Sequence, residues 1–151
     1  MSSKHHSADL AMQHMSLFRR IIEEGFTNQE FDVFDQIISP EILEHQPGMG
    51  AGPQGVKGAV AYLHSVFPNF TLAIEELTYD GEKVWARLRA RGTQEGSHMG
   101  MPPTGKPIDV TVFDICRFQD GKMVEHWGVP DRFAIMEQLG MLPVPGPPQA
   151  A

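Results

Sequence analysis

The stretch 107–129, PIDVTVFDICRFQDGKMVEHWGV, decides the fold class. Two runs rich in β-branched and aromatic residues, 107–118 and 122–129, flank a short QDGK segment, which is typical of antiparallel strands joined by a tight turn. Two similar runs precede them at 70–79 and 83–96, and the segments DGE and HMGMPPTGK separate the runs. We therefore expect four long antiparallel strands that form a meander.

The sequence before Pro68 has a helical period instead of alternation. Gly25 is well placed to end a first helix, Asn28 is a plausible N-cap of a second, and Pro40 stops that second helix. Pro68 bounds a third helix, after a loop rich in glycine and proline. The pattern predicts three helices, over residues 8–24, 28–39 and 56–67.

The segment after the last strand predicts a short closing helix, capped by Asp131 and ended by Gly140, before a proline-rich tail. Because helices come first and strands afterwards, the fold class is α+β. We expect one domain over residues 1–151, with an ordered core at about 8–140 and tails at 1–7 and 141–151.

Composition excludes several classes of function. The net charge of -7 argues against a nucleic-acid partner, because such binding relies on clustered Lys and Arg. The single cysteine permits no internal disulfide and leaves no metal-binding cysteine pair, so we expect a reducing interior and no metal. Since no apolar signal core and no membrane-span run is present, we expect a cytoplasmic protein without a membrane partner.

Several short motifs occur in a specific order: GMPPTGK before a long strand, then DGKMVEHW, Pro-Asp and a QLG ending. In this order of elements, residues 8–140 resemble the SnoaL-like polyketide cyclase family. The resemblance implies a cone-shaped α+β barrel, shared with ketosteroid isomerase, in which a curved antiparallel sheet wraps around N-terminal helices. It also implies a deep apolar pocket whose side chains move protons on a small hydrophobic carbonyl compound, without a cofactor.

The chain departs from the family's cyclases at two positions. Their acid/base carboxylate falls at Gly128 here, and a histidine of the preceding strand falls at Asp114. The resemblance therefore implies an acid/base enzyme in a broad sense, a cyclase, isomerase or lyase. A hydrolase of an epoxide or ester that uses activated water is one alternative, and a non-catalytic small-molecule-binding protein is another.

The turn at QDGK decides which side chains of the last hairpin share a face. A two-residue loop would pair Asp114 with Trp127 and send His126 to the opposite face. A three-residue loop would place Asp114 directly across from His126. We favour the three-residue loop, because it puts both polar side chains on the face that would line the cone.

Asp114 and His126 are the first two candidate catalytic residues. In a dry pocket the carboxylate either holds the tautomer of a histidine base or is itself the base, and either arrangement serves proton abstraction next to a carbonyl. The competing interpretation is a structural carboxylate and a histidine that only packs.

Asp131 is the third catalytic candidate, although helix capping explains it better. His45, Trp127, Met101 and Cys116 are the candidate substrate-binding residues. Their alternatives are a surface-loop histidine at 45, a methionine that fills a packing gap, and a buried thiol that is merely a small hydrophobe.

Both faces of the last hairpin are apolar, whereas a sheet with one wet face alternates more cleanly. We assign one face to the pocket and the other to a second subunit, which predicts a homodimer or homotetramer. Val112, Cys116 and Val124 are expected on one side, and Phe113, Ile115, Met123 and Trp127 on the other.

Overall fold

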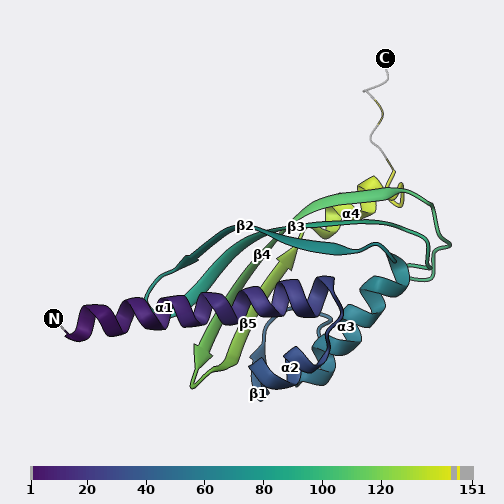
Figure 1. Ribbon diagram of the computed structural model, residues 1–151. Coiled ribbons are helices and arrows are strands. Elements are labelled where there is room, and N and C mark those ends of the chain that lie inside the picture. The colour runs from purple at the N-terminus through teal and green to yellow at the C-terminus, as the bar shows by residue number, and fades with distance from the viewer. Residues whose placement is uncertain (1, 144–145, 147–151) are drawn as a thin grey trace.

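The structure, a computed structural model, describes residues 2–143 and 146, and within them it shows helices packed on one curved five-stranded sheet (Figure 1). The strands are β1 (Ile38–Glu44), β2 (Thr71–Tyr79), β3 (Lys83–Thr93), β4 (Pro107–Gln119) and β5 (Lys122–Pro130). The helices are α1 (Ser2–Arg20), the π-helix η1 (Ile21–Thr27), α2 (Asp32–Ile37), α3 (Gly52–Val66) and α4 (Arg132–Gln138). The predicted α+β class and the cone-shaped arrangement are confirmed.

The sheet has the strand order β1-β5-β4-β3-β2, so the predicted meander of β2 to β5 is confirmed. The prediction of a wholly antiparallel sheet is wrong, because β1 pairs with β5 in parallel. The segment ISPEILE enters the sheet directly after α2 and contains Pro40, so its sequence resembles a helix end more than a strand.

The first helix does not end at Gly25. It continues from α1 into η1 and reaches Thr27, with Asn28 as its C-cap and not as an N-cap of the next helix. A side chain at position 25 would collide with the ring of Phe34, so glycine is needed for close packing between helices.

The other helix boundaries also shift. α1 begins at Ser2 and so includes most of the segment 1–7 that we predicted to be a tail. The first residues of α1 are polar, so they extend the helix without contributing to the periodic pattern of apolar residues from which the helix was predicted. α2 is shorter than predicted and α3 begins at Gly52, four residues before the predicted start. Most of the predicted tail 141–151 lies outside the described residues.

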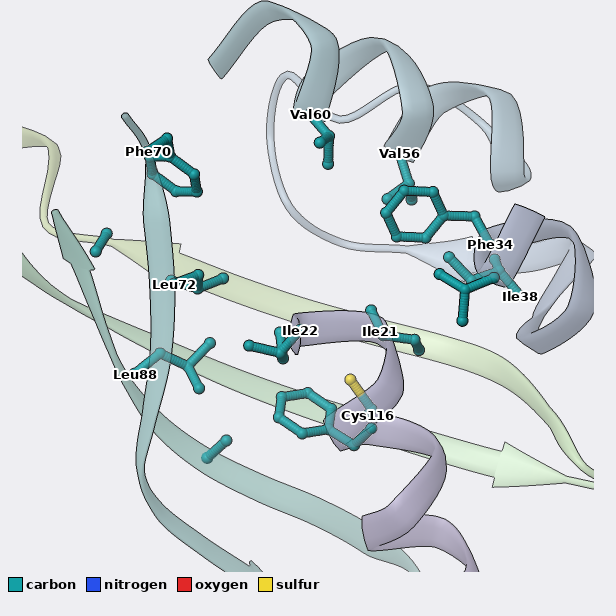
Figure 2. Close-up of a cluster of buried hydrophobic side chains, with 14 of the residues drawn as sticks. Ile21, Ile22, Phe34, Ile38, Val56, Val60, Phe70, Leu72, Leu88 and Cys116 are labelled. Carbon is teal, nitrogen blue, oxygen red and sulfur yellow. The ribbon is translucent and has the colours of Figure 1, made fainter. Parts of the chain in front are cut away.

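The core lies between the helices and the concave face of the sheet. Figure 2 shows Ile21 and Ile22 from η1 pointing toward strand side chains such as Leu88 and Cys116. Full burial of each large aliphatic side chain contributes roughly 1.5–3 kcal/mol. Sheet and helices are thereby held together around the space that becomes the candidate site.

The β4-β5 hairpin has a two-residue turn, so the favoured three-residue loop is wrong. Gln119 pairs with Lys122, and Asp120 and Gly121 have φ of 50 and 75°, as a type I′ turn requires. The register then shifts between Met123 and Glu125, which leaves Val124 as the extra residue of a β-bulge. Beyond the bulge, every side chain of β5 faces the side opposite to the one that a plain two-residue hairpin would give.

Candidate active site

A cavity of about 890 Å³ lies between the concave face of the sheet and the helices. Most of its wall is apolar, with Phe18, Ile22 and Val56 from the helices and Val110 and Met123 from the sheet. Polar side chains interrupt this wall at the middle of β4 and β5. A mainly apolar cavity with a few convergent polar groups is typical of a small-molecule site.

Asp114 and His126 both line this cavity, on the concave face of the sheet. Asp114 pairs with Gly128 and Cys116 pairs with His126, so the two polar residues are diagonal neighbours. His126 Nε2 lies 3.3 Å from Asp114 Oδ1, and the two residues are only 7% and 8% exposed. The predicted proximity of acid and imidazole is confirmed, although the bulge produces it and not the register that we favoured.

Glu44 completes the cluster and was missed by the sequence analysis. It is the parallel partner of His126, and its two carboxylate oxygens lie 2.7 and 2.9 Å from His126 Nδ1. Strand alternation allows only one of Glu44 and His45 to face the cavity. The resemblance favoured the histidine, whereas the structure buries the glutamate side chain against His126.

The cluster holds His126 as an imidazolium. Burial alone would lower its pKa, but hydrogen bonds and charge interactions with Asp114 and Glu44 outweigh burial and raise the pKa to about 9. Both ring nitrogens therefore donate, Nδ1 to Glu44 and Nε2 toward Asp114. At neutral pH His126 is therefore a fixed cation in the cavity wall, between the carboxyl groups of Asp114 and Glu44.

Cys116 lines the same cavity, two residues from Asp114, and is 1% exposed. Burial raises the pKa of its thiol well above the ordinary value, and the nearby Asp114 and Glu44 charges raise it further. The thiol is therefore protonated at neutral pH. It forms part of the apolar wall rather than a nucleophile.

His45 and Trp127 lie on the other face of the sheet and do not line the cavity. Their rings stack with centroids 4.5 Å apart, and His45 Nε2 lies 2.9 Å from Glu125 Oε1. Glu125 in turn accepts a hydrogen bond from Arg117. This placement corrects the expectation that His45 and Trp127 contact the substrate, because the bulge and the alternation of β1 turn both outward.

Asp131 and Met101 also lie outside the cavity lining. Asp131 caps α4 through a 2.9 Å hydrogen bond from the Ala134 backbone N–H, as the capping interpretation predicts. Met101 is 48% exposed and pairs with His98 through backbone hydrogen bonds, whereas Met99 of the same loop reaches the cavity.

In the residues that the structure describes, no group of three or more His, Cys, Asp or Glu side chains is arranged so that it could hold a metal ion. Across the same part of the chain, none of the helices is both long and apolar enough to cross a membrane.

Comparisons with known proteins agree with this architecture. The sequence model of the SnoaL-like polyketide cyclase family matches residues 16–139. A relative from Streptomyces peucetius, aklanonic acid methyl ester cyclase DnrD, is 32% identical over 132 residues, which cover 83% of this chain and 90% of that protein.

Solved structures of similar proteins have the same fold. TsrD from Streptomyces laurentii superposes with a TM-score of 0.79 at 25% identity, over 87% of this chain and 97% of its own. IdmH from Streptomyces antibioticus has a TM-score of 0.74 at 29% identity, over 83% of this chain and 96% of its own.

Proposed function

Because this chain belongs to the SnoaL-like polyketide cyclase family, we propose that it is a cofactor-independent cyclase that closes a ring in a hydrophobic carbonyl compound. The observation that carries the proposal is the Glu44, His126 and Asp114 cluster, in which His126 and Asp114 line a mainly apolar cavity. By its name, the relative DnrD acts on aklanonic acid methyl ester, which makes that compound the first substrate to test.

Asp114 is the base in this proposal. Its carboxylate takes a proton from a carbon next to a carbonyl group, and the electron pair of the broken C–H bond passes into an enolate. Of the cluster's two carboxylates, Asp114 is the better placed, because Glu44 accepts from both His126 and the backbone N–H of Gln46. A positioned base of this kind contributes roughly 10²- to 10⁴-fold in rate.

His126 is the acid. The enolate carbon attacks the carbon of a second carbonyl in the same molecule, a C–C bond forms, and the π electrons of that carbonyl move to its oxygen. The oxygen takes the proton of His126 Nε2, because Nδ1 is bound to Glu44. The proton on Asp114 then passes to His126 across their 3.3 Å contact, so the cycle balances without another reactant.

The experiment is a ring-closure assay with aklanonic acid methyl ester in heavy water. We expect an isomeric cyclised product. Because the deprotonated carbon forms the new C–C bond, deuterium enters that carbon only in molecules whose enolate is reprotonated before the ring closes. Deuterium incorporation without ring closure would identify an isomerase instead, and heavy oxygen taken from labelled water would identify a hydrolase. A chain that binds the compound and changes nothing in it would be a binding protein.

Asp114→Asn is the decisive variant, because asparagine keeps the shape of the side chain but cannot accept the proton. We expect kcat to fall by roughly 10²- to 10⁴-fold while the Kd for the compound changes little. Asp131→Asn is the matched control, because asparagine also caps helices well and Asp131 lies outside the cavity. Full activity of Asp114→Asn would remove Asp114 from the mechanism.

A further inference from the structure

The loop after β1 places one more polar side chain beside the cluster, that of Gln46. Gln46 lines the cavity and is half-buried. A Cβ atom added at Gly128 would collide with Gln46 Oε1 and would lie 2.9 Å from both Asp114 Oδ1 and His126 Cε1. The amide of Gln46 therefore occupies the space that the missing side chain of Gly128 leaves open, next to the acid and the imidazolium.

The backbone of Gln46 is fixed relative to the reacting groups. Its N–H donates to Glu44 Oε1 at 2.8 Å, and the same oxygen lies 2.7 Å from His126 Nδ1. The loop is also tied to α4, because Arg132 Nη2 donates to the Pro47 carbonyl at 2.7 Å. One carboxylate thus positions both the histidine ring and the backbone that carries Gln46.

The side-chain amide of Gln46 has no hydrogen-bond partner within the part of the chain that the structure describes. Gln94 shows what a structural glutamine looks like in this protein. Gln94 is buried, its Nε2 donates to the Gly96 carbonyl, and its Oε1 accepts from the backbone and hydroxyl of Thr104. Gln46 instead lines the cavity, and its Oε1 lies against Gly128, next to Asp114 and His126.

We propose that Gln46 is a substrate-binding residue whose amide Nε2 donates to the carbonyl oxygen of the group that Asp114 deprotonates. This inference rests on the proposed function and adds the group that stabilises the enolate oxygen. A neutral amide suits this place, because it donates without adding charge to a cluster that already holds a cation and two carboxyl groups. Gly128 is then required because any larger residue displaces the amide.

The test is a double-mutant cycle with Gln46→Leu, Gly128→Ala and the double variant, assayed on aklanonic acid methyl ester. Removal of one preorganised donor to an oxyanion lowers kcat by about 100-fold, and we expect that loss in Gln46→Leu. Gly128→Ala should show a comparable loss, because its methyl group moves the amide. The double variant should be no worse than the poorer single variant, since both changes remove the same interaction.

The matched control is Gln13→Leu, an exposed glutamine on α1 outside the cavity lining, which should keep wild-type activity. Thermal unfolding of every variant separates loss of fold from loss of the contact. Wild-type kcat and Kd in a folded Gln46→Leu variant would overturn the inference, and so would losses that add fully in the double variant.

A binding measurement distinguishes this inference from the proposed function. If the wild type binds the methyl ester but neither closes the ring nor exchanges deuterium, the proposed function fails. In that case the Kd for the methyl ester still tests whether Gln46 contacts the compound. About tenfold weaker binding by Gln46→Leu supports it, and an unchanged Kd overturns it. Absence of binding by the wild type overturns both.

Discussion

The two faces of the β4-β5 hairpin place the same kinds of side chain in different environments. On the concave face, His126 is buried between two carboxylates and its pKa rises to about 9. On the convex face, His45 stacks on Trp127 and pairs with Glu125, with 42% of its side chain exposed. An imidazole next to a carboxylate therefore occurs on both sides, but only the concave pair adjoins a cavity that can hold a substrate.

One residue separates these outcomes. Val124 is the extra residue of the bulge, and beyond it His126 faces the cavity while Trp127 faces outward. Without the bulge, the two-residue turn would pair Asp114 with Trp127 and turn His126 away from the acid. The chemistry of this sheet therefore depends on a local irregularity of the backbone as much as on residue type.

Insertion of an alanine between Glu125 and His126 should have the largest effect. The bulge at Val124 stays and the added residue pairs with Cys116, so that His126 would face solvent and Trp127 would be forced toward the cavity. We expect loss of activity together with a loss of roughly 4 kcal/mol or more in the free energy of unfolding, which denaturant titration measures. Val124→Ala keeps the register and is the control. A stable, active insertion variant would show that the register does not position the site.

Glu44→Gln tests the concave face itself. The glutamine keeps a hydrogen-bond acceptor for His126 Nδ1 but removes one of the two charges that raise the pKa of His126. In the wild type, activity that needs the imidazolium should decline as pH rises through about 9. In Glu44→Gln the midpoint of that decline should move to lower pH, as a pH profile of kcat/KM would show. An unmoved midpoint would mean that Glu44 does not control the charge of His126.

The free energy of unfolding should also depend on the protonation of His126. The pKa of His126 is higher in the folded protein than the ordinary value of 6.5, so its stabilising contribution is fully present below about pH 6.5 and is lost as pH rises through 9. Glu44→Gln should reduce this pH dependence and cost roughly 1–3 kcal/mol near neutral pH. Denaturant titrations at pH 6 and pH 10 measure both effects.

Only part of this arrangement could be predicted from the sequence. The helices and the meander follow from apolar period and turn residues. The family motifs favour a shared face for Asp114 and His126, but the bulge at Val124 and not the predicted turn produces it. Glu44 and Gln46 could not be predicted in the same way. Their positions depend on β1 joining the sheet in parallel and on a bulge, and neither has a local sequence signal.

We expect the convex face of the sheet to contact a second subunit. Phe113 and Val129 pair across β4 and β5 and are 56% and 66% exposed, and Trp85 is 44% exposed on the adjacent strand. We propose that a second copy of the chain covers this apolar patch, because a symmetric dimer buries the same patch on both subunits. Light scattering should give twice the chain mass for the wild type and the monomer mass for Phe113→Asp. A monomeric wild type would contradict this proposal.

Replacement of His45 should have the smallest effect and so gives the sharpest contrast with His126. His45→Ala removes an exposed hydrogen bond to Glu125 and a stack on Trp127, which together contribute about 1 kcal/mol. We expect turnover within about twofold of wild type, since an exposed convex-face change leaves the cavity intact. His126→Ala, assayed in parallel, removes the proposed acid and should lose roughly 10²-fold or more. A loss of similar size in His45→Ala would mean that His45 takes part in the reaction. It would contradict the assignment of catalysis to the concave face alone.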